Sequence, residues 1–565
     1  MTVESLFQAF SQQLNTDTLA PLLQQYPEHA YTYFAKGTLA FQAGDWPKAE
    51  AAFTQAYLAR SGLWEALFYK ARTLEAQYRF VEAAQLYEQV LSTHPQHMKV
   101  WQHLLAVWQL LGEHERTLAV IASLVGDRGQ AQWRDHPDYA LWCMRLEALA
   151  LLLRFGDEAV TARQLWRQAQ HWYQQHLVSL APASSLAVQR PENASRLRVG
   201  YLSNEWTSAA VELGYAALFE YHARQQQLAI YALCPQGAPL PSKALRMHFE
   251  DLLLLDSRQA SAYVGALERF DVVVDLSGWF HVDAWQHLAA AAVPVKVLLA
   301  SNPPFFAPGT LFDAIVADSY VLPRARQREL SSRFIGQSCF FHWQPGADLP
   351  RTLEQAQQQS ARKTISVPGE GPFRFGVVAS RNKINTASLR LWAGVLKAFP
   401  ERAVLTLKGL YYQDPYIQQQ LLHAFAAVGG SPEQLAFEDN RQREDLYSFF
   451  LEQDMILDTV PYSGALSTCD AFWAGTPVMS LGSERGIATS LHRNTGTPEL
   501  LADHPGDFIE KTLQLAHQPG MRQRYTISLP AQLWHSPICQ WPAFGASMED
   551  LYRQLWQQKM KKKFE

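Results

Sequence analysis

The first 180 residues carry the apolar spacing of amphipathic helices, and within them the pattern itself repeats. The segment Trp46–Phe53 matches Phe80–Tyr87, so that an aromatic, a small and a second aromatic residue each return after 34 positions. One further step of 34 reaches His114, Thr117 and Ile121. Because small residues at a contact let a partner helix approach closely, the repeat predicts stacked pairs of helices.

The helix expected before each of these segments repeats in the same way. Gly37 and Ala71 are spaced by 34, and Pro95 falls where the second helix of a pair should stop. This pattern resembles the tetratricopeptide repeat over about residues 30–127, and a further helical stretch is expected at about 137–178. An ordinary helical bundle is the alternative. A repeat array of this kind offers a concave surface to a peptide or a partner protein.

After residues 181–195, which lose the helical period and are expected to form a linker, short apolar runs alternate with amphipathic stretches. Such runs predict strands of a parallel sheet, buried on both faces. The first series is Leu197–Ser203, Leu228–Cys234, Asp271–Asp275, Val295–Ala300 and Ala314–Asp318. The second series, after a break near 345–370, is Phe373–Ser380, Ala403–Lys408, Leu435–Glu438, Met455–Leu457 and Pro477–Leu481. Two tandem α/β halves imply a cleft, with ligands at the carboxyl ends of the strands.

The length of 565 residues suggests roughly three or four domains. The composition, with 48% apolar and 18% charged residues, is that of a globular chain. The formal charge of -4 argues against a nucleic-acid partner. The five cysteines form no CxxC pair, so neither a disulfide framework nor a structural zinc site is expected. Without a signal peptide or an apolar stretch long enough to span a bilayer, the chain is expected to be soluble and cytoplasmic.

Three common nucleotide and metal motifs are absent from the sequence. Neither half has a G-x-G-x-x-G after its first strand, and no G-x-x-x-x-G-K-[ST] occurs, so a dinucleotide site and a P-loop are disfavoured. No Asp-x-Asp occurs either, although a metal-dependent glycosyltransferase ordinarily needs clustered carboxylates. What remains is a fold that handles a diphosphate without metal, through helix N-termini and a basic side chain.

A loop rich in glycine, serine and threonine follows the strand that ends near Thr459. A helix is expected from about Ser467, so that the backbone around Gly464 and the hydroxyls of Ser467 and Thr468 gather at a positive helix end, which is an anion site. Asp470, in the first turn, is placed to accept hydrogen bonds from ribose hydroxyls. The alternative is that Ser467 and Thr468 only cap the helix while Asp470 favours its dipole.

This loop and the turn Trp473–Pro477 resemble the nucleotide-binding signature of the O-GlcNAc transferase/SPINDLY family. The resemblance places Asp470 on the family's ribose-binding aspartate and Lys383, within Ser380–Trp392, on the lysine that holds the donor diphosphate. Arg443 lies at the position of a basic residue near the base. The resemblance thus implies a donor site made by a small set of residues: Ser380, Lys383, Arg443, Gly464, Ser467, Thr468 and Asp470.

The resemblance extends over nearly the whole chain, because Leu197–Ser203 resembles the family's opening strand and Asp275–Gly278 its strand-end motif beside the active cleft. It implies an α + α/β chain of GT-B type. The expected parts are tetratricopeptide-like helical repeats at 1–180, a linker at 181–195, an N-terminal Rossmann-like lobe on the acceptor side at 196–345, a C-terminal Rossmann-like donor lobe at 371–545, and a C-terminal helix at 546–565.

The sequence departs from the family pattern mainly on the acceptor side. The histidine expected after the opening strand is missing from residues 204–212. In the donor loop Ala465 replaces a histidine and Thr468 replaces a glycine, and the usual Leu-Gly-Tyr-Pro-Gly-Thr turn is replaced at Leu299–Thr310. His281 follows the strand-end glycine after two aromatic residues. The donor nucleotide is therefore better specified by the sequence than the sugar or the acceptor.

The resemblance implies a metal-independent, inverting protein glycosyltransferase. It would use a nucleotide sugar, UDP-GlcNAc or another UDP-hexose, as co-substrate, without a further cofactor, and its acceptor protein would be held by the helical repeats. Lys383, Ser467 and Thr468 would stabilise the departing diphosphate. The candidates for accepting the acceptor's proton are Asp275, Glu212 and His281, each of which also has an ordinary structural explanation.

Serine and threonine are the acceptors that the resemblance favours, and three alternatives stay open. Asparagine is possible because the adhesin N-glucosyltransferases are similar relatives. The missing histidines would suit a catalytically silent interaction protein with a degenerate donor site. A small or lipid-linked acceptor would leave the repeats a role only in assembly.

Overall fold

The computed structural model describes residues 2–125 and most of the chain from 196 to 564, together with residues 170, 173–174 and 177–180. The gaps after 196 are 257–258, 279–282, 300–308, 322–332, 338, 340, 347, 368, 400–401, 440–442 and 483–485. The chain divides into two compact units. The first holds Met1–Ala119, and the second holds nearly all of the rest, Val120–Gln413 and Gln418–Glu565.

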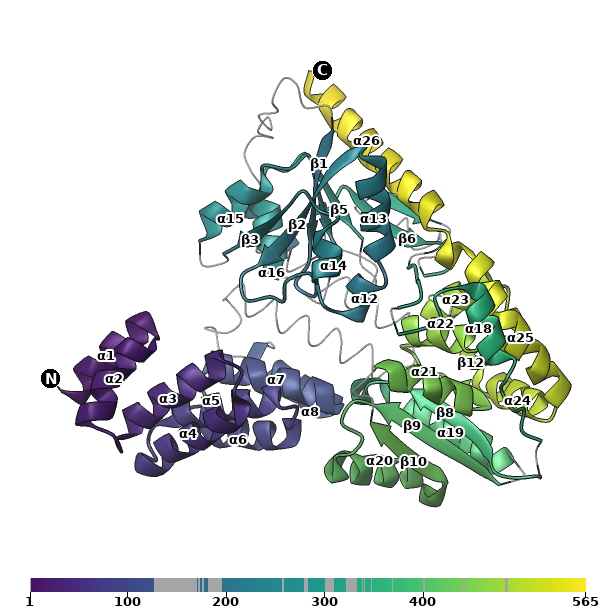
Figure 1. Ribbon diagram of the computed structural model, residues 1–565, viewed down its shortest axis with the longest axis horizontal. Coiled ribbons are helices and arrows are strands. Elements are labelled where there is room, and N and C mark those ends of the chain that lie inside the picture. Colours follow the sequence, from purple (N-terminus) through teal and green to yellow (C-terminus); the bar gives the residue numbers. More distant parts are fainter. Residues whose placement is uncertain are drawn as a thin grey trace. The chain divides into compact units, whose positions relative to one another are not determined.

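The first unit consists of antiparallel helices, drawn in purple in Figure 1. They are α1 (Val3–Gln13), α2 (Thr16–Gln25), α3 (Ala30–Gln42), α4 (Trp46–Ala59), α5 (Trp64–Ala76), α6 (Phe80–Thr93), α7 (Met98–Leu111) and α8 (His114–Val125). Ala49, Ala83 and Thr117, which the 34-residue spacing relates, are all completely buried. A Cβ on Gly37 would lie 2.7 Å from the ring of Phe53, so the small residue permits the close contact of α3 with α4. The repeat therefore has the packing that its spacing predicts.

The N-terminal lobe of the second unit is a parallel sheet in the order β3-β2-β1-β4-β5-β6-β7. Its strands are β1 (Leu197–Leu202), β2 (Leu228–Pro235), β3 (Asp251–Leu255), β4 (Val272–Asp275), β5 (Val295–Leu298), β6 (Ala314–Asp318) and β7 (Arg333–Gln337). Its helices are α12 (Ala209–Glu212), α13 (Ala216–Gln225), α14 (Lys243–Arg246), α15 (Ala260–Leu267) and α16 (Asp283–Ala290). All seven strands run parallel, as buried apolar runs separated by helices predict.

The C-terminal lobe is a second parallel sheet, in the order β10-β9-β8-β11-β12-β13. Its strands are β8 (Phe373–Val378), β9 (Ala403–Gly409), β10 (Leu435–Asp439), β11 (Met455–Leu457), β12 (Val478–Leu481) and β13 (Leu501–Ala502). The helices around it are α18 (Leu353–Ser360), α19 (Thr386–Ala398), α20 (Pro415–Ala427), α21 (Arg443–Glu452), α22 (Leu466–Trp473), α23 (Ile487–Thr495), α24 (Pro505–Ala516) and α25 (Pro519–His535). The strand order reverses at β8: β9 and β10 lie on one side of it, and β11, β12 and β13 lie on the other. In parallel α/β sheets such a reversal point forms a crevice at the carboxyl ends of the strands.

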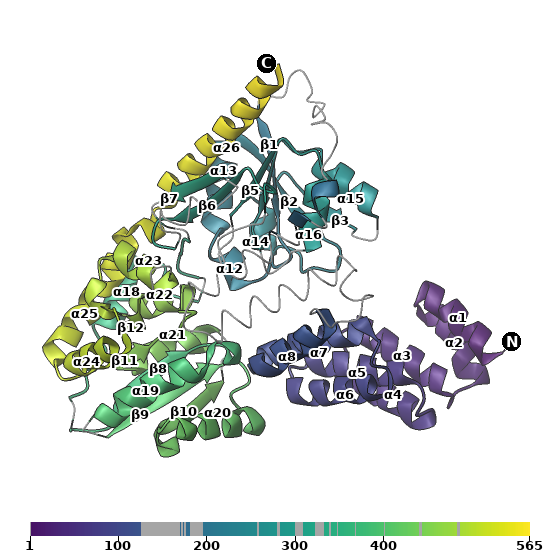
Figure 2. The same ribbon diagram turned by 180° about the vertical axis from the view of Figure 1, so that it is seen from behind.

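A long final helix, α26 (Trp541–Phe564), leaves the C-terminal lobe and packs on the N-terminal lobe, where both views show it along α13 (Figures 1 and 2). Met548 and Tyr552 are completely buried in the core of that lobe. Glu549 lies 3.0 Å from Nδ1 of His222 on α13. A direct bond also joins the lobes, because the Ser490 hydroxyl donates to Oδ2 of Asp318 over 2.5 Å.

The architecture confirms the predicted fold class of helical repeats followed by two Rossmann-like lobes. The ten predicted strands are all present, and three more, β3, β7 and β13, were not predicted. Most of the helical stretch expected at 137–178 and all of the linker at 181–195 lie outside the described residues. None of the described helices is long and apolar enough to cross a membrane.

Candidate functional site

A cavity of about 180 Å³ lies between the two lobes, at the carboxyl ends of β8 and β11. Its walls come from five parts of the second unit: the segment around α12 and α13, the connection between the lobes, the turn after β8, the predicted donor loop and the start of α23. The described residues that line it are Ala210, Gly214, Tyr215, Phe341, His342, Lys383, Tyr462, Ser463, Ala465, Leu466, Ser467 and Ile487. The cavity thus lies where a parallel α/β sheet binds its ligand.

The helix α22 begins at this cavity without a side chain to cap it. Its first residue is Leu466, and the N-cap position is Ala465, which has no hydrogen-bonding side chain. Ser467 and Thr468 lie inside the first turn, not at the cap, so the alternative of a simple capped helix does not describe this end. Ala465, Leu466 and Ser467 all line the cavity. The unsatisfied N–H groups of the first turn and the positive end of the helix dipole therefore suit an anion there.

The loop before α22 is held by Asp458, which is buried. Its Oδ1 accepts the backbone N–H groups of Thr459 and Gly464, each over 2.8 Å, and its Oδ2 accepts the Ser480 hydroxyl over 2.7 Å. Burial raises the pKa of Asp458, while these three donors and the Lys383 ammonium lower it. The carboxylate therefore holds the loop through hydrogen bonds, and Asp458 is not among the described residues that line the cavity.

Gly464 is required by the close approach of the loop to the helix. A Cβ at this position would lie 2.7 Å from Oγ1 of Thr468 and 2.8 Å from Oγ of Ser467. Thr468 is buried and Ser467 is half-buried. The structure thus brings together these three residues, which the sequence predicts for the donor site, and leaves Ser467 on the cavity wall.

Lys383 lies on the same wall, in the short 3-10 turn Arg381–Lys383 after β8. Its Nζ is 4.1 Å from the centre of the Tyr462 ring, which supports a cation on its face. Burial lowers the pKa of Lys383 to about 8, partly opposed by the carboxylate of Asp458. An anionic ligand would stabilise the ammonium form, and the Lys383 side chain is positioned to provide its positive charge to that ligand.

The start of α19 ties Lys383 to the donor loop. The Asn385 amide donates to the Val460 carbonyl over 2.7 Å, and the Ser388 hydroxyl bonds the same carbonyl over 3.1 Å. Asn385 also caps α19 by accepting the Ser388 N–H over 2.9 Å. Two segments that lie about eighty residues apart in the sequence are thereby fixed against each other at the cavity.

Asp470 is buried, and its Oδ1 accepts the indole N–H of Trp343 over 2.8 Å. It is not among the described residues that line the cavity. Ser380 is exposed and donates to Oδ1 of Asn382 over 2.5 Å. Arg443 begins α21, and its side chain lies outside the described residues. The contacts predicted for Asp470, Ser380 and Arg443 with the nucleotide stay predictions.

The two candidate proton acceptors that the structure describes, Asp275 and Glu212, are not among the described residues that line this cavity. Asp275, at the end of β4, accepts the N–H groups of Ser277 and Gly278 on Oδ1 over 2.9 and 3.2 Å, and the indole N–H of Trp285 on Oδ2 over 2.8 Å. These bonds fix the turn after β4 and favour a structural role. Glu212 is half-buried at the end of α12 and does not appear among the described cavity residues. His281 lies outside the described residues.

Four aromatic residues among those described on the cavity wall were not found from the sequence: Tyr215, Phe341, His342 and Tyr462. The Tyr215 hydroxyl donates to the Leu299 carbonyl over 2.9 Å, which leaves its ring as part of the wall. His342 lies in the connection between the lobes, in a stretch without an element or a motif that would have drawn attention to it.

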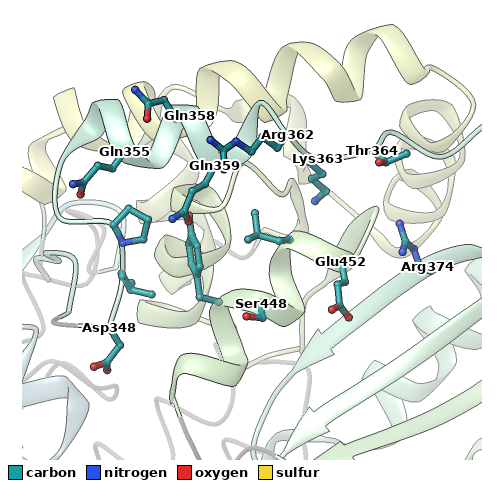
Figure 3. Close-up of a pocket in the computed structure, with 14 residues that line it drawn as sticks. Asp348, Gln355, Gln358, Gln359, Arg362, Lys363, Thr364, Arg374, Ser448 and Glu452 are labelled. Atoms are coloured by element: carbon teal, nitrogen blue, oxygen red, sulfur yellow. The ribbon is translucent and has the colours of Figure 1, made fainter.

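A larger cavity, of about 990 Å³, lies between α18 and α21. Figure 3 shows Gln355 and Gln359 on α18 above Ser448 and Glu452 on α21. Its other end is formed near Arg374, which is the second residue of β8, so this cavity lies toward the amino ends of the strands. This edge of the sheet is opposite the donor loop. Parallel α/β sheets bind their ligands at the carboxyl ends of the strands, which is the edge where the donor loop lies.

Comparison with known proteins agrees with this geometry. Residues 350–544 match glycosyl transferase family 41. The chain is 22% identical over 380 residues to a probable UDP-N-acetylglucosamine–peptide N-acetylglucosaminyltransferase SPINDLY of Petunia hybrida, an alignment that covers 64% of this chain and 39% of that protein. It is 23% identical over 386 residues to the corresponding SEC protein of Arabidopsis thaliana, covering 66% of this chain and 38% of that one.

The resemblance to the O-GlcNAc transferase/SPINDLY family is confirmed. The matched family domain contains Lys383 and the whole donor loop. The solved structure of an O-GlcNAc transferase mutant from Thermobaculum terrenum has the same fold, with a TM-score of 0.77 and 22% identity, covering 94% of this chain and 98% of that one. The chain spans about two fifths of the length of the curated relatives that it matches.

Proposed function

We propose that the protein is an inverting glycosyltransferase that moves a sugar from a UDP-linked donor to a side chain of an acceptor protein, with serine and threonine as the expected acceptors. One observation carries the proposal. Lys383 and the uncapped start of α22 line the same cavity between the two lobes. That combination of a cation with free helix N–H groups is what a nucleotide diphosphate requires.

The same groups would lower the barrier of transfer. As the glycosidic bond breaks, negative charge develops on the departing diphosphate, and donors that are already in place stabilise it without reorganisation. Lys383 supplies a positive charge, and the first turn of α22, with the Ser467 hydroxyl, supplies hydrogen-bond donors. Asp458 and Gly464 keep these groups in position through the loop contacts described above.

The donor and the acceptor are proposed from the relatives and from the order of the parts. The relatives named above are probable UDP-N-acetylglucosamine–peptide transferases, so UDP-GlcNAc is the first donor to test. The helical repeats would hold the acceptor protein, as repeat surfaces hold extended peptides. Asp470 and Arg443 are kept as proposed contacts of the ribose and the base. A cytoplasmic location stays a prediction.

The transfer does not require a strong base, because positioning and electrostatics can supply much of the barrier reduction. Oδ1 of Asp275 accepts two N–H groups of the turn after β4 and Oδ2 accepts the indole N–H of Trp285 on α16, so this residue is a poor candidate for a base. An acceptor hydroxyl that is held in line with the breaking bond loses its proton late in the transition state, and much of the barrier reduction comes from alignment and from stabilisation of the leaving group.

Hydrolysis of the donor tests the proposal without knowledge of the acceptor. The wild type should release UDP slowly from UDP-GlcNAc by transfer to water, and the sugar should appear first with the inverted anomeric configuration in an NMR spectrum. Lys383→Ala should lower the release rate by about 100-fold or more, as the loss of a charge stabiliser does. The matched control is Lys397→Ala, which removes an exposed lysine at the far end of α19.

Equal rates of UDP release in the wild type and in Lys383→Ala would contradict the assignment of Lys383. A retained anomeric configuration would contradict inversion. No release from any nucleotide sugar, with no binding of UDP, would leave the chain as a protein-interaction module with a degenerate donor site.

A further inference from the structure

We propose that His342 is a second donor-binding residue, whose imidazole hydrogen-bonds the diphosphate of the nucleotide sugar alongside Lys383. This inference rests on the proposed function and goes beyond it, because His342 stands at none of the positions where the family pattern places a histidine. It follows from the position of the ring, from its missing partners and from the charges around it.

His342 lines the cavity between the lobes, together with Lys383 and Ser467. It lies in the connection from the N-terminal to the C-terminal lobe and is only 1% exposed. A residue in this connection is held by both lobes, so its place relative to the donor loop is fixed by the packing of the whole second unit.

Two aromatic residues of the described part of the chain pack on the ring of His342. Its centre lies 4.0 Å from that of Phe544 and 4.6 Å from that of Trp541, both at the start of α26. These contacts position the imidazole ring. Nδ1 is buried and has no hydrogen-bond partner in the described part of the protein. Because buried polar atoms nearly always have a partner, an orphan at a cavity wall indicates that a ligand supplies it.

The electrostatics of the cavity suit an anion as that ligand. Burial lowers the pKa of His342 to about 3, so the ring is neutral in the free protein at ordinary pH. The titratable groups that line the cavity with it are Lys383, Tyr215 and Tyr462, and the two rings packed on it, Trp541 and Phe544, carry no charge. No described carboxylate lines this cavity. A diphosphate would bring in negative charge, stabilise the imidazolium and so draw a proton onto His342.

Proton uptake on binding therefore separates this role from a structural one. UDP-GlcNAc carries a diphosphate diester that stays fully ionised between about pH 5 and 7, where the unperturbed histidine pKa lies, so a proton taken up there must come to the protein. Lys383, with a pKa of about 8, is already protonated in that range.

The test is calorimetric titration of UDP-GlcNAc at about pH 6, an acidity near the ordinary histidine pKa, in two buffers that differ in ionisation enthalpy. The variant His342→Phe keeps a ring between Trp541 and Phe544 but removes both nitrogens. It should bind UDP-GlcNAc at least about tenfold more weakly, the effect of losing one charged hydrogen bond, and it should lose the proton uptake that the wild type shows. Its melting temperature should equal or exceed that of the wild type, because an unpartnered polar group has been removed.

His342→Gln serves as the second variant, because its amide can still donate a hydrogen bond but cannot take up a proton. It should recover part of the affinity and none of the proton uptake. His535→Phe is the matched control, since this exposed histidine at the end of α25 does not line the cavity. Wild-type affinity in His342→Phe, or equal proton uptake in His342→Phe and the wild type, would overturn the inference. A wild type that binds no nucleotide sugar would instead refute the proposed function.

Discussion

The two oxygens of Asp458 show how the donor loop is built residue by residue. They accept two backbone N–H groups of the loop and one hydroxyl from β12, which fixes the loop before any ligand binds. Gly464 then lets the loop lie directly against the first turn of α22. Preorganisation of this kind matters at a leaving-group site, because donors that must move into place stabilise a developing charge less.

The pH dependence of donor binding is a prediction at this scale. Below pH 8 the Lys383 ammonium is present in the free protein, and the affinity for UDP-GlcNAc should be constant as far as this residue is concerned. Above pH 8 the free protein loses this proton while the complex retains it, so the affinity should fall, approaching about tenfold per pH unit. Calorimetric titrations between about pH 7 and pH 9.5, across the fall of the lysine charge, measure this slope.

The control for this slope is Lys383→Arg, because an arginine keeps its charge at every pH of the series. In that variant the fall in affinity that sets in above pH 8 should be absent. A fall of equal steepness in Lys383→Arg would mean that another group causes the pH dependence.

The sequence predicted part of this site at the level of single residues. Gly464 and Ser467 were predicted because they lie in a loop rich in glycine, serine and threonine before a helix, whereas Lys383 was predicted only from the resemblance to the family. His342 was not found, because its significance depends on rings of α26 that lie about two hundred positions away. Asp275 stays a predicted proton acceptor; its Oδ1 accepts N–H groups of the turn after β4, and its Oδ2 accepts the indole N–H of Trp285 on α16.

Among the elements, the segment after α18 shows how a distant part of the donor lobe supports the signature turn. Nζ of Lys363 donates to the Thr476 hydroxyl over 2.6 Å and to the Phe450 carbonyl over 3.2 Å. It thereby joins the end of α18 both to the turn before β12 and to the last turn of α21. Burial lowers the pKa of Lys363 to about 7, with only partial compensation by Asp454.

This contact predicts a pH dependence of stability. In the unfolded chain a lysine titrates near a pKa of about 10.4, so between about pH 7 and that value the unfolded state binds more protons than the folded one. The free energy of unfolding should therefore rise with pH through this window, and Lys363→Met should reduce the slope. Urea unfolding from about pH 6.5 to pH 9.5, a range that covers the start of the window, measures it. The exposed Lys397→Met is the control and should leave the slope unchanged; an equal slope in Lys363→Met and the wild type would contradict the assignment.

Strands were predicted from the sequence where several apolar residues follow one another in a run of at least three residues. The strands β1, β2, β8 and β9 are short, mostly apolar runs of six to eight residues, the length and composition that predict a buried strand. β3 was not predicted although its four leucines form an apolar run; it is an edge strand, and Leu254 is 62% exposed. β13 has only two residues, too few for a period to be seen.

The second unit as a whole depends on α26. This helix begins beside Trp343 in the connection between the lobes, and its buried residues as far as Leu555 belong to the core of the N-terminal lobe. Both Figures 1 and 2 show it running from one lobe to the other. Because His342 packs on its first turn, the helix also contributes to the wall of the cavity.

A large-to-small substitution in the buried face of α26 should therefore destabilise the N-terminal lobe and not only the helix. Met548 is completely buried in the core of the N-terminal lobe, and Met548→Ala should lower the free energy of unfolding by about 2–5 kcal/mol. Urea unfolding followed by tryptophan fluorescence measures the loss. Gln557→Ala, on the exposed face of the same helix, should change stability by less than about 0.5 kcal/mol. A loss as small as that in Met548→Ala would contradict the account of α26.

At the scale of the whole chain, the order of the parts could be predicted because each part has its own periodicity. A repeat of 34 residues gives way to apolar strand runs, and the resemblance to the O-GlcNAc transferase/SPINDLY family gives the same order. The return of α26 to the first lobe could not be predicted, since a helical pattern says which face is apolar but not which core receives it.

Binding of the donor nucleotide is the claim on which the function depends, and calorimetric titration tests it most directly. UDP, GDP and their sugar conjugates are titrated without added metal into the wild type and into Lys383→Ala. The account predicts that the wild type binds a UDP compound, that GDP compounds bind more weakly, and that Lys383→Ala binds at least about tenfold more weakly with an unchanged melting temperature. Absence of binding in the wild type, or equal binding in Lys383→Ala, would contradict it.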